Sequence, residues 1–272
     1  WRQAHGLSTE MSDTGSASGS MSAKAPPTPE DVHNQFLSLF NDQPEVYRVL
    51  IDGVHEAGAR AVVAAGVSLE AMLKHAHADD VVVKFAPQIH SLPADADLVL
   101  VTAAGNDLEY LGSAVKLGVL FTVDRYTGGR LLRRKPAVMP TVTPARCDQA
   151  AAGLARIVTE TRSRAPQARV VLVDYLPMVG DTTVPFVDVP FDRNAIEALT
   201  AVHDALSGVF TDVADSTGAD LARASLLGRG HELGSPSPWI QPLQPLHRVA
   251  SSFHPTRDGM KAVAAELLTI LT

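Results

Sequence analysis

The chain has 272 residues, of which 46% are hydrophobic and 19% charged, and its formal net charge is −7. This balance is typical of a globular protein and excludes a disordered chain, and the length suffices for one large domain with a buried core. The acidic balance argues against nucleic acid as a partner, because the only pronounced basic run is RLLRRK at 130–135. No apolar run is long enough to span a bilayer.

Cys147 is the single cysteine, so an internal disulfide is excluded. No catalytic signature surrounds it, and we interpret it as a small residue near the start of a helix. The chain begins at Trp1 rather than Met, from which we expect a processed or trimmed form that no longer carries any export signal it had.

The first residues are interpreted as a segment distinct from the rest. Residues 12–29 are rich in Ser, Gly, Ala and Pro, a composition typical of a loop or linker. Thr28-Pro29-Glu30 then combines an N-cap, a first-turn proline and an acid, which indicates the start of a helix. We therefore expect an N-terminal segment at 1–28 and a single domain at 29–272.

Helical patterns and short apolar runs alternate along that domain. Strands are predicted at 59–66, 97–105, 168–177 and 219–225, and helices at 30–40, 44–56, 68–78, 106–120, 146–165, 194–218 and 254–271. Residues 121–143 hold Gly, Pro and basic residues and predict an excursion over the surface. The alternation predicts an α/β fold with a parallel sheet covered by helices on both faces.

Ligands of such sheets bind at the carboxyl ends of the strands, and three residues at these ends indicate catalysis. Asn106 follows a strand and can donate from its amide to an oxyanion; the alternative is that it only caps a helix. His254 precedes a proline, which keeps it out of a regular helix and suits a general base; the alternative is an ordinary surface histidine. Gly66 ends an apolar run and can bring its N–H to a ligand; the alternative is a simple turn.

Metal and cofactor motifs are not found in the sequence. His75 and His77 are two residues apart on a predicted helix and do not share a face, so we expect no metal site there. Neither a G-x-G-x-x-G fingerprint nor a P-loop occurs, which argues against a nucleotide cofactor.

Five segments, in this order and spacing, resemble the SGNH (GDSL-type) hydrolases, in particular the secreted esterases and lipases of actinobacteria. The likeness extends over about residues 45–272 and is most specific at 85–113. The five segments are Gly66, GND at 105–107, VVLVDYLPMVG at 170–180, GHELGSPSPWI at 230–240, and FHP with GM at 253–260.

The resemblance implies a three-layer α/β/α sandwich with a five-stranded parallel sheet, flavodoxin-like. It further implies hydrolysis of carboxylic esters without a cofactor or metal, with a serine-type nucleophile in the first block, His254 as its base, and Gly66 and Asn106 in the oxyanion hole. The partner would be a small-molecule or lipid ester. The implied location is secreted or cell-envelope, with the cytoplasm as the alternative; the oligomeric state is not indicated.

Two positions depart from the family pattern. Gly-Asp-Ser, the first block, does not occur; the nearest match is SDTGSASG at 12–19, which puts Thr14 at the nucleophile position and leaves Ser12 as the more usual hydroxyl. A second register puts Glu10 there, and a third alternative is a block upstream of Trp1. Ser251 stands where the family often has the aspartate that orients the histidine, and either its hydroxyl or a backbone carbonyl can take that role.

These features predict a serine-type carboxylic ester hydrolase, an esterase or lipase. Two alternatives remain open: a catalytically impaired ligand-binding protein on the same fold, and an acyltransferase. Thr14 in place of serine favours the first alternative, whereas Gly66, Asn106 and His254 favour the hydrolase.

Overall fold

The computed structural model describes residues 61–65, 89 and 92–271. The N-terminal segment at 1–28 and the helices predicted at 30–40, 44–56 and 68–78 lie outside these residues, so they stay predictions. Within the described part, four strands form one sheet in the order β1-β2-β3-β4, and every neighbouring pair is parallel. The strands are β1 (Ala61–Ala65), β2 (Leu98–Thr102), β3 (Arg169–Val173) and β4 (Asp220–Ala222).

The two inner strands are short apolar runs with no polar alternation. Residues 98–101 of β2 and 170–173 of β3 are buried, and the two strands pair with Leu98 opposite Arg169. Such runs are expected where both faces of a parallel sheet are covered.

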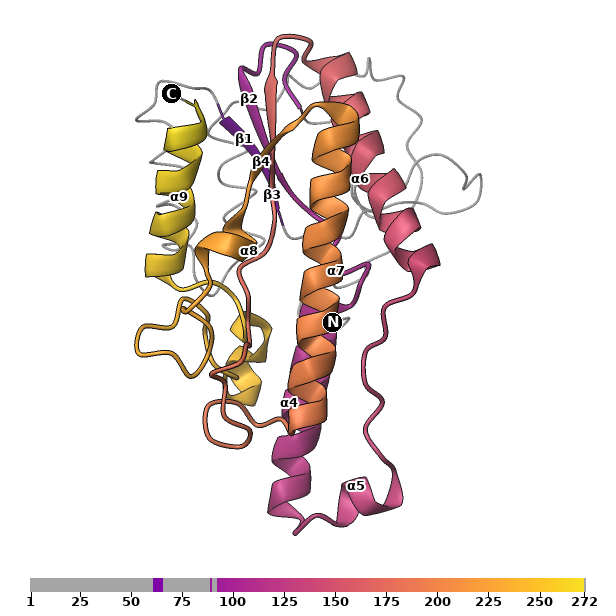
Figure 1. Cartoon of the computed structure of the whole chain (residues 1–272), viewed down its shortest axis with the longest axis vertical. Coiled ribbons are helices and arrows are strands. Elements are labelled where there is room, and N and C mark those ends of the chain that lie inside the picture. Colours follow the sequence, from indigo (N-terminus) through magenta and orange to yellow (C-terminus); the bar gives the residue numbers. More distant parts are fainter. Residues whose placement is uncertain (1–60, 66–88, 90–91, 272) are drawn as a thin grey trace, which may run out of the picture.

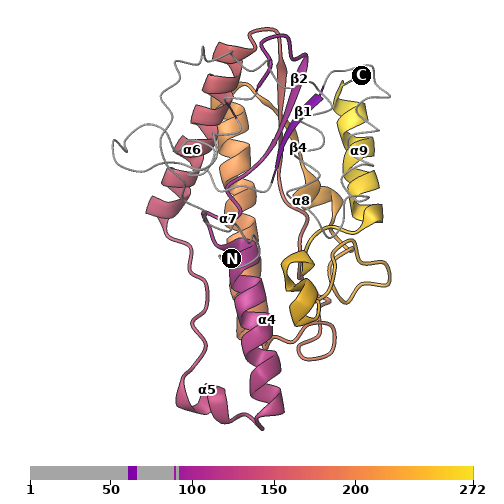
Figure 2. The ribbon, with the colours of Figure 1, turned by 180° about the vertical axis from the view of Figure 1, so that it is seen from behind.

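Helices cover both faces of the sheet (Figure 1). On one face lie α6 (Pro144–Arg164) and α7 (Arg193–Thr217), which pack against each other, and on the other face lies α9 (Arg257–Leu271) beside β4. The view from behind shows the same three layers (Figure 2). The predicted α/β architecture with a parallel sheet is thus confirmed. A flavodoxin-like sheet has the order 2-1-3-4-5, and that order and the count of five strands stay predictions.

Capping residues explain where the two long helices begin and end. The Thr143 side chain accepts a hydrogen bond from the Arg146 N–H, and Pro144 takes the first turn of α6. Asp192 caps α7 by accepting from the Ala195 N–H at 2.8 Å, and Gly218 ends it with a φ of 65°. Both helices lie within a residue or two of their predicted bounds.

The helix after β2 differs from its prediction at both ends. It was expected at 106–120, but α4 spans Tyr110–Tyr126, because residues 104–109 form a tight turn in which Glu109 has a φ of 56°. Its last turns and the short helix α5 (Arg130–Arg134) occupy part of the stretch predicted as a surface excursion. The helix continues past residue 120 because neither Gly nor Pro occurs at 119–127, and it ends before Gly128 and Gly129, which both have positive φ. As a result α4 projects beyond the carboxyl edge of the sheet (Figure 1).

Candidate active site

Two of the predicted site residues lie at the carboxyl edge of the sheet. Asn106 follows β2 directly, and His254 precedes α9, whose first turn lies at that same edge (Figure 1). Ser12, Thr14 and Gly66 lie outside the described residues. The structure therefore shows the surroundings of the expected base and of one expected oxyanion donor.

A short backbone pairing fixes the segment that carries His254. The Gln241 N–H donates to the His254 carbonyl at 2.8 Å, and the Phe253 N–H donates to the Gln241 carbonyl at 3.0 Å. The Thr256 N–H donates to the Trp239 carbonyl at 2.7 Å. Because these bonds and Pro255 end the extended segment, α9 begins at Arg257, three residues after its predicted start.

The loop at 230–239, which leads into this pairing, is held by contacts of its own. His231 and Trp239 stack with ring centroids 3.7 Å apart, and His231 Nδ1 donates to the Ser237 carbonyl at 2.7 Å. Gly259 of α9 packs so closely that a Cβ there would lie 2.9 Å from atoms of Trp239. The segment 230–240, which contains His231 and Trp239, thus supports the segment that carries His254.

The His254 imidazole is held in one tautomer. Its Nδ1 lies 3.0 Å from the Ser252 carbonyl oxygen, and a carbonyl can only accept, so Nδ1 carries the proton and Nε2 the lone pair. Burial lowers the pKa of His254, and the carbonyls of Ser252 and Ser251 oppose this effect in part. The ring is therefore neutral at neutral pH, which is the state that a general base requires.

The Ser251 side chain has a different partner from the one proposed for it. Ser251 is buried at the end of the 3-10 helix Leu246–Ser251, and its hydroxyl donates to the Arg248 carbonyl at 2.8 Å. Of the two orienting groups considered, the backbone carbonyl, that of Ser252, is the one that contacts Nδ1. The role of the Ser251 hydroxyl as orienter stays a prediction.

Asn106 lies in the turn between β2 and α4, with an exposed side chain. Glu109 is the residue that stands at the N-cap of α4, so helix capping does not account for Asn106. The turn is tightly built, since Ala104 has a φ of 77° and its carbonyl accepts from the N–H groups of Asp107 and Leu108. Backbone strain of this kind is common where a side chain must be held for function.

Two side chains distant in sequence hold this turn. The Tyr175 hydroxyl accepts a hydrogen bond from the Gly105 N–H at 3.2 Å, and its ring lies so close that a Cβ on Gly105 would be 2.7 Å from it. Arg146 donates from Nη2 to the Asp107 carbonyl at 2.6 Å. The residues on both sides of Asn106 are thereby anchored to β3 and to α6.

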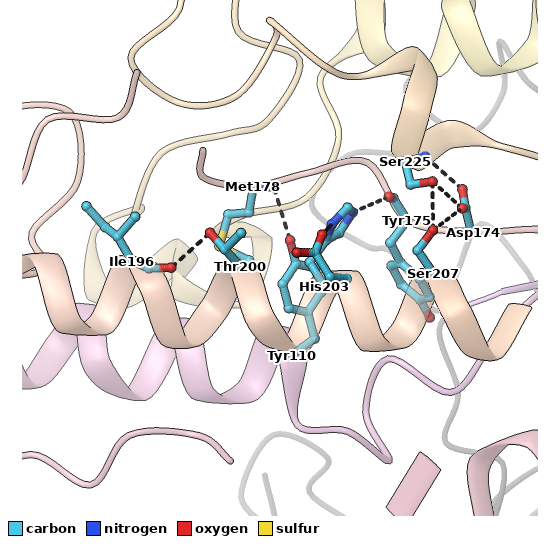
Figure 3. Close-up of polar contacts among 10 residues, drawn as sticks. Tyr110, Asp174, Tyr175, Met178, Ile196, Thr200, His203, Ser207 and Ser225 are labelled. Atoms are coloured by element: carbon cyan, nitrogen blue, oxygen red, sulfur yellow. Dashed lines mark hydrogen bonds and ion pairs between the residues drawn. The ribbon is translucent and has the colours of Figure 1, made fainter. Parts of the chain in front are cut away.

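A buried aromatic network supports Tyr175 in turn (Figure 3). His203 Nε2 donates to the Tyr175 carbonyl at 2.8 Å, and the Tyr110 hydroxyl accepts from the Met178 N–H at 3.0 Å. The Tyr110 ring lies 6.3 Å from that of Tyr175 and 5.6 Å from that of His203. Burial raises the pKa of both tyrosines, so both hydroxyls are neutral.

A second polar cluster lies beside this network, at the end of β3 (Figure 3). Asp174 accepts from the Ser225 N–H at 2.7 Å, from the Ser225 hydroxyl, and from the Ser207 hydroxyl at 3.1 Å. Burial raises the pKa of Asp174, and the hydrogen bonds from Ser225 and Ser207 oppose that shift. The cluster joins β3 to α7 and to α8 (Ala224–Leu227), and we assign it a structural role.

Sequence reasoning assigned no role to Tyr175 or Arg146. Tyr175 had one signal, since it lies two residues past β3 and hence at the carboxyl edge. Arg146 had none, because its target is a backbone carbonyl 39 residues away. Contacts of this kind become visible only in the tertiary structure.

The described residues contain neither a metal-binding cluster nor a membrane-spanning helix. No group of three or more His, Cys, Asp or Glu side chains in the described part is placed to hold a metal ion. None of the helices that the structure describes has the length and apolar character to cross a membrane.

The family of the chain follows from a comparison with known families. The model of the GDSL-like lipase/acylhydrolase family matches residues 40–262. The chain belongs to this family, which confirms the resemblance to the SGNH (GDSL-type) hydrolases. The matched range includes Gly66, Asn106, Ser251 and His254 and begins after Ser12 and Thr14.

Individual relatives come from Streptomyces. The chain is similar to Lipase 2 of Streptomyces coelicolor, with 26% identity over 191 residues, which cover 68% of this chain and 63% of that protein. The match therefore spans less than two thirds of that relative's length. Among solved structures, an extracellular lipase from Streptomyces rimosus has 22% identity and a TM-score of 0.49, covering 67% of this chain and 72% of that one. The phospholipase A1 from Streptomyces albidoflavus has 19% identity and a TM-score of 0.49, and the match covers 68% of this chain and 71% of that one.

Proposed function

We propose that this protein is a serine-type carboxylic ester hydrolase in which His254 is the general base. The observation that carries the proposal is the His254 imidazole, which is neutral and donates from Nδ1 to the Ser252 carbonyl at 3.0 Å. This tautomer has its lone pair on Nε2, the atom that must accept a proton from a hydroxyl nucleophile. The family assignment to lipases and acylhydrolases supports the same reaction.

The proposed reaction has two halves. In the first, Nε2 removes the proton from a nucleophile hydroxyl while its oxygen attacks the ester carbonyl; the Asn106 amide and the Gly66 N–H donate to the oxyanion, and the imidazolium then protonates the departing alcohol. In the second half, His254 Nε2 removes a proton from water while the water oxygen attacks the acyl carbonyl; the bond between the acyl carbon and the nucleophile oxygen then breaks, the imidazolium returns its proton to that oxygen, and the acid is released. The Ser252 carbonyl stabilises the imidazolium in both halves, a weaker substitute for the usual carboxylate.

The nucleophile is proposed from the first block of the sequence. Thr14 has the better register with the family pattern, and Ser12 has the more usual chemistry. Either hydroxyl would complete the base and oxyanion donors described above, and reagent labelling decides between them.

Hydrolysis of a short p-nitrophenyl ester tests the assignment of the base. His254→Ala is expected to lower kcat by about 10³-fold, because the proton transfer is lost. His247→Ala is the matched control, since His247 is an exposed histidine of the same stretch, and it should retain full activity. Equal rates for wild type and His254→Ala would remove the catalytic assignment.

Labelling with a fluorophosphonate, followed by peptide mapping, tests the nucleophile. We expect one adduct within residues 1–26. If Thr14 is the nucleophile, Thr14→Ala abolishes the adduct, and if Ser12 is the nucleophile, Ser12→Ala abolishes it. An adduct on a serine elsewhere would support the hydrolase assignment but would show that the nucleophile lies outside the first block. Tight ester binding with neither adduct nor turnover would establish the ligand-binding alternative instead.

A further inference from the structure

The far end of α4, together with α5, concentrates positive charge in an otherwise acidic protein. Between positions 116 and 135 the chain has six basic residues and one acidic residue, whereas the net charge of the whole chain is −7. The six are Lys116, Arg125, Arg130, Arg133, Arg134 and Lys135, and all of them are exposed. Lys116 lies in the first half of α4, whereas the other five lie at 125–135, and that end of α4, with α5, lies furthest from the sheet (Figures 1 and 2).

Most of these basic side chains form neither an ion pair nor a side-chain hydrogen bond within the described part of the molecule. Arg133 donates to the carbonyls of Gly128 and Gly129, which closes the turn between the two helices. Asp124, the one acid, accepts from the Leu132 N–H at 2.9 Å and thus also serves the turn. No ion pair or side-chain hydrogen bond joins any of the other five cations to another residue that the structure describes.

Large apolar side chains are exposed among the same charges. Tyr126 at the end of α4 is 88% exposed, and Val138, just past α5, is 84% exposed. The loop at 184–187 packs on α4, with the ring centroids of Phe186 and Phe121 5.9 Å apart. At the tip itself, Leu131 lines one groove with Val138 and another with Val123, so exposed apolar side chains adjoin one another there, which marks an interaction surface.

A groove runs along α4 between this end and the Asn106 turn. It encloses about 380 Å³ between α4 and residues 135–140, and Glu109, three residues after Asn106, lines its inner end. Its walls are mainly apolar, with Leu117, Leu120 and Met139, and Lys116 and Lys135 also line it. Apolar walls beside ammonium groups match an amphiphile that has an acyl chain and an anionic headgroup.

We propose that this end of the molecule docks on an anionic lipid surface. The docking tip is defined as the segment 123–135 and Val138. Basic side chains beside exposed apolar ones are the pattern that binds anionic headgroups and enters the acyl boundary. A single-stranded nucleic acid would stack on aromatic platforms in a basic groove, and the tip offers Tyr126 alone. A duplex would bind the basic side chains through its phosphates and would leave the exposed Val138 without a role.

The fold orients the docked molecule. Because α4 starts directly after β2, it extends from the carboxyl edge of the sheet, and its 17 residues reach about 25 Å from that edge. Docking through the tip therefore turns the edge that carries Asn106 toward the lipid. The docking proposal does not depend on turnover and can be tested on a protein without esterase activity.

Co-sedimentation of the whole chain with lipid vesicles tests the proposal. We expect binding to phosphatidylglycerol vesicles and little binding to phosphatidylcholine vesicles. Raising the salt from about 0.1 M to about 1 M should weaken the binding, because the Debye length falls from about 10 Å to about 3 Å.

Paired variants assign the binding to the tip. Arg130→Gln with Arg134→Gln should lower the partition coefficient roughly 25-fold, about fivefold for each charge. Arg223→Gln with Arg229→Gln removes the same charge from exposed positions elsewhere and should leave the coefficient unchanged. Tyr126→Ser with Val138→Ser should lower it about tenfold, and Leu226→Ser, at an exposed apolar position on α8, should have no effect.

Three results would overturn the proposal. The first is no binding to phosphatidylglycerol at low salt, and the second is equal loss in the tip and control variants. The third is a concentration-dependent dimer that Tyr126→Ser abolishes, since it would show that the tip binds a second copy of the chain. Circular dichroism melts of each variant verify that the fold is kept.

Discussion

At the scale of single residues, the state of His254 determines how the proposed reaction responds to pH. Burial holds the pKa of His254 below its ordinary value of 6.5 in the folded protein. We expect kcat/KM to rise with pH through a midpoint below 6.5 and then to stay level, because only the neutral ring accepts a proton. A pH–rate profile on a short ester measures the midpoint, and a midpoint at or above 6.5 would contradict the prediction.

The same shift has a consequence for stability. As pH falls below 6.5 the imidazole of the unfolded chain gains a proton before that of the folded chain, so the free energy of unfolding falls. The contribution of the neutral His254 to the free energy of unfolding is fully present above pH 6.5. It is lost as the pH falls from 6.5 toward the lower pKa that His254 has in the folded protein. Urea unfolding across this range, compared with His254→Ala, isolates the effect.

Tyr175 is the residue whose hydroxyl holds the Asn106 turn, and its removal should separate positioning from stability. Tyr175→Phe leaves the Gly105 N–H without its acceptor and should cost about 1 kcal/mol of stability. It should also lower kcat about tenfold with KM little changed, because the Asn106 amide would be less well placed.

Tyr110→Phe is the matched control for this change. Its hydroxyl also accepts a backbone N–H, that of Met178, but does not contact the Asn106 turn. We expect a similar loss of stability with an unchanged kcat. Equal losses of kcat in the two variants would assign Tyr175 a purely structural role.

At the scale of elements, the junction of β2 and α4 depends on a glycine. A Cβ at Gly105 would lie 2.7 Å from the Tyr175 ring, which packs against Tyr110 and Phe210 and has little room to move. Gly105→Ala is therefore expected to lower the free energy of unfolding by about 1–3 kcal/mol, measured by urea unfolding.

Gly112 provides the opposite result in the same helix. It lies within α4, and a Cβ there would meet no atom within 4 Å. Gly112→Ala should raise stability by about 0.5–1 kcal/mol, because alanine favours the helix. A loss of stability in Gly112→Ala would show that the surroundings of α4 differ from those described.

At the scale of the whole molecule, the Asp174 cluster joins three elements that are distant in sequence. Its carboxylate accepts from Ser207 of α7 and from Ser225 of α8, 33 and 51 residues away. Asp174→Ala removes the acceptor of the buried Ser225 N–H and hydroxyl, whereas the Ser207 hydroxyl keeps the Ser225 oxygen at 2.9 Å. The change should cost about 3 kcal/mol in urea unfolding. Asp212→Ala, at an exposed position of α7, should change stability by less than about 0.5 kcal/mol.

The sequence alone determined the α/β class, the parallel sheet and the family, because apolar periodicity and motif order are local properties of the chain. It also placed Asn106 and His254 at one edge, since parallel strands share their carboxyl ends. The predicted start of α4 was wrong by four residues, because the turn at 104–109 depends on Tyr175 and Arg146, which lie far away in sequence.

Only the tertiary structure decided which groups hold the site. The orienting contact of His254 is a backbone carbonyl, and the anchor of the Asn106 turn is a tyrosine hydroxyl; neither follows from residue type or spacing. The docking tip could also be recognised only in the tertiary structure. In the sequence RLLRRK is a basic run without context, whereas in the structure it follows α4 at the end that projects beyond the sheet, where Tyr126 and Val138 are exposed. Propensity and periodicity act within a few residues, whereas contacts across 39 to 70 residues form only when the layers pack.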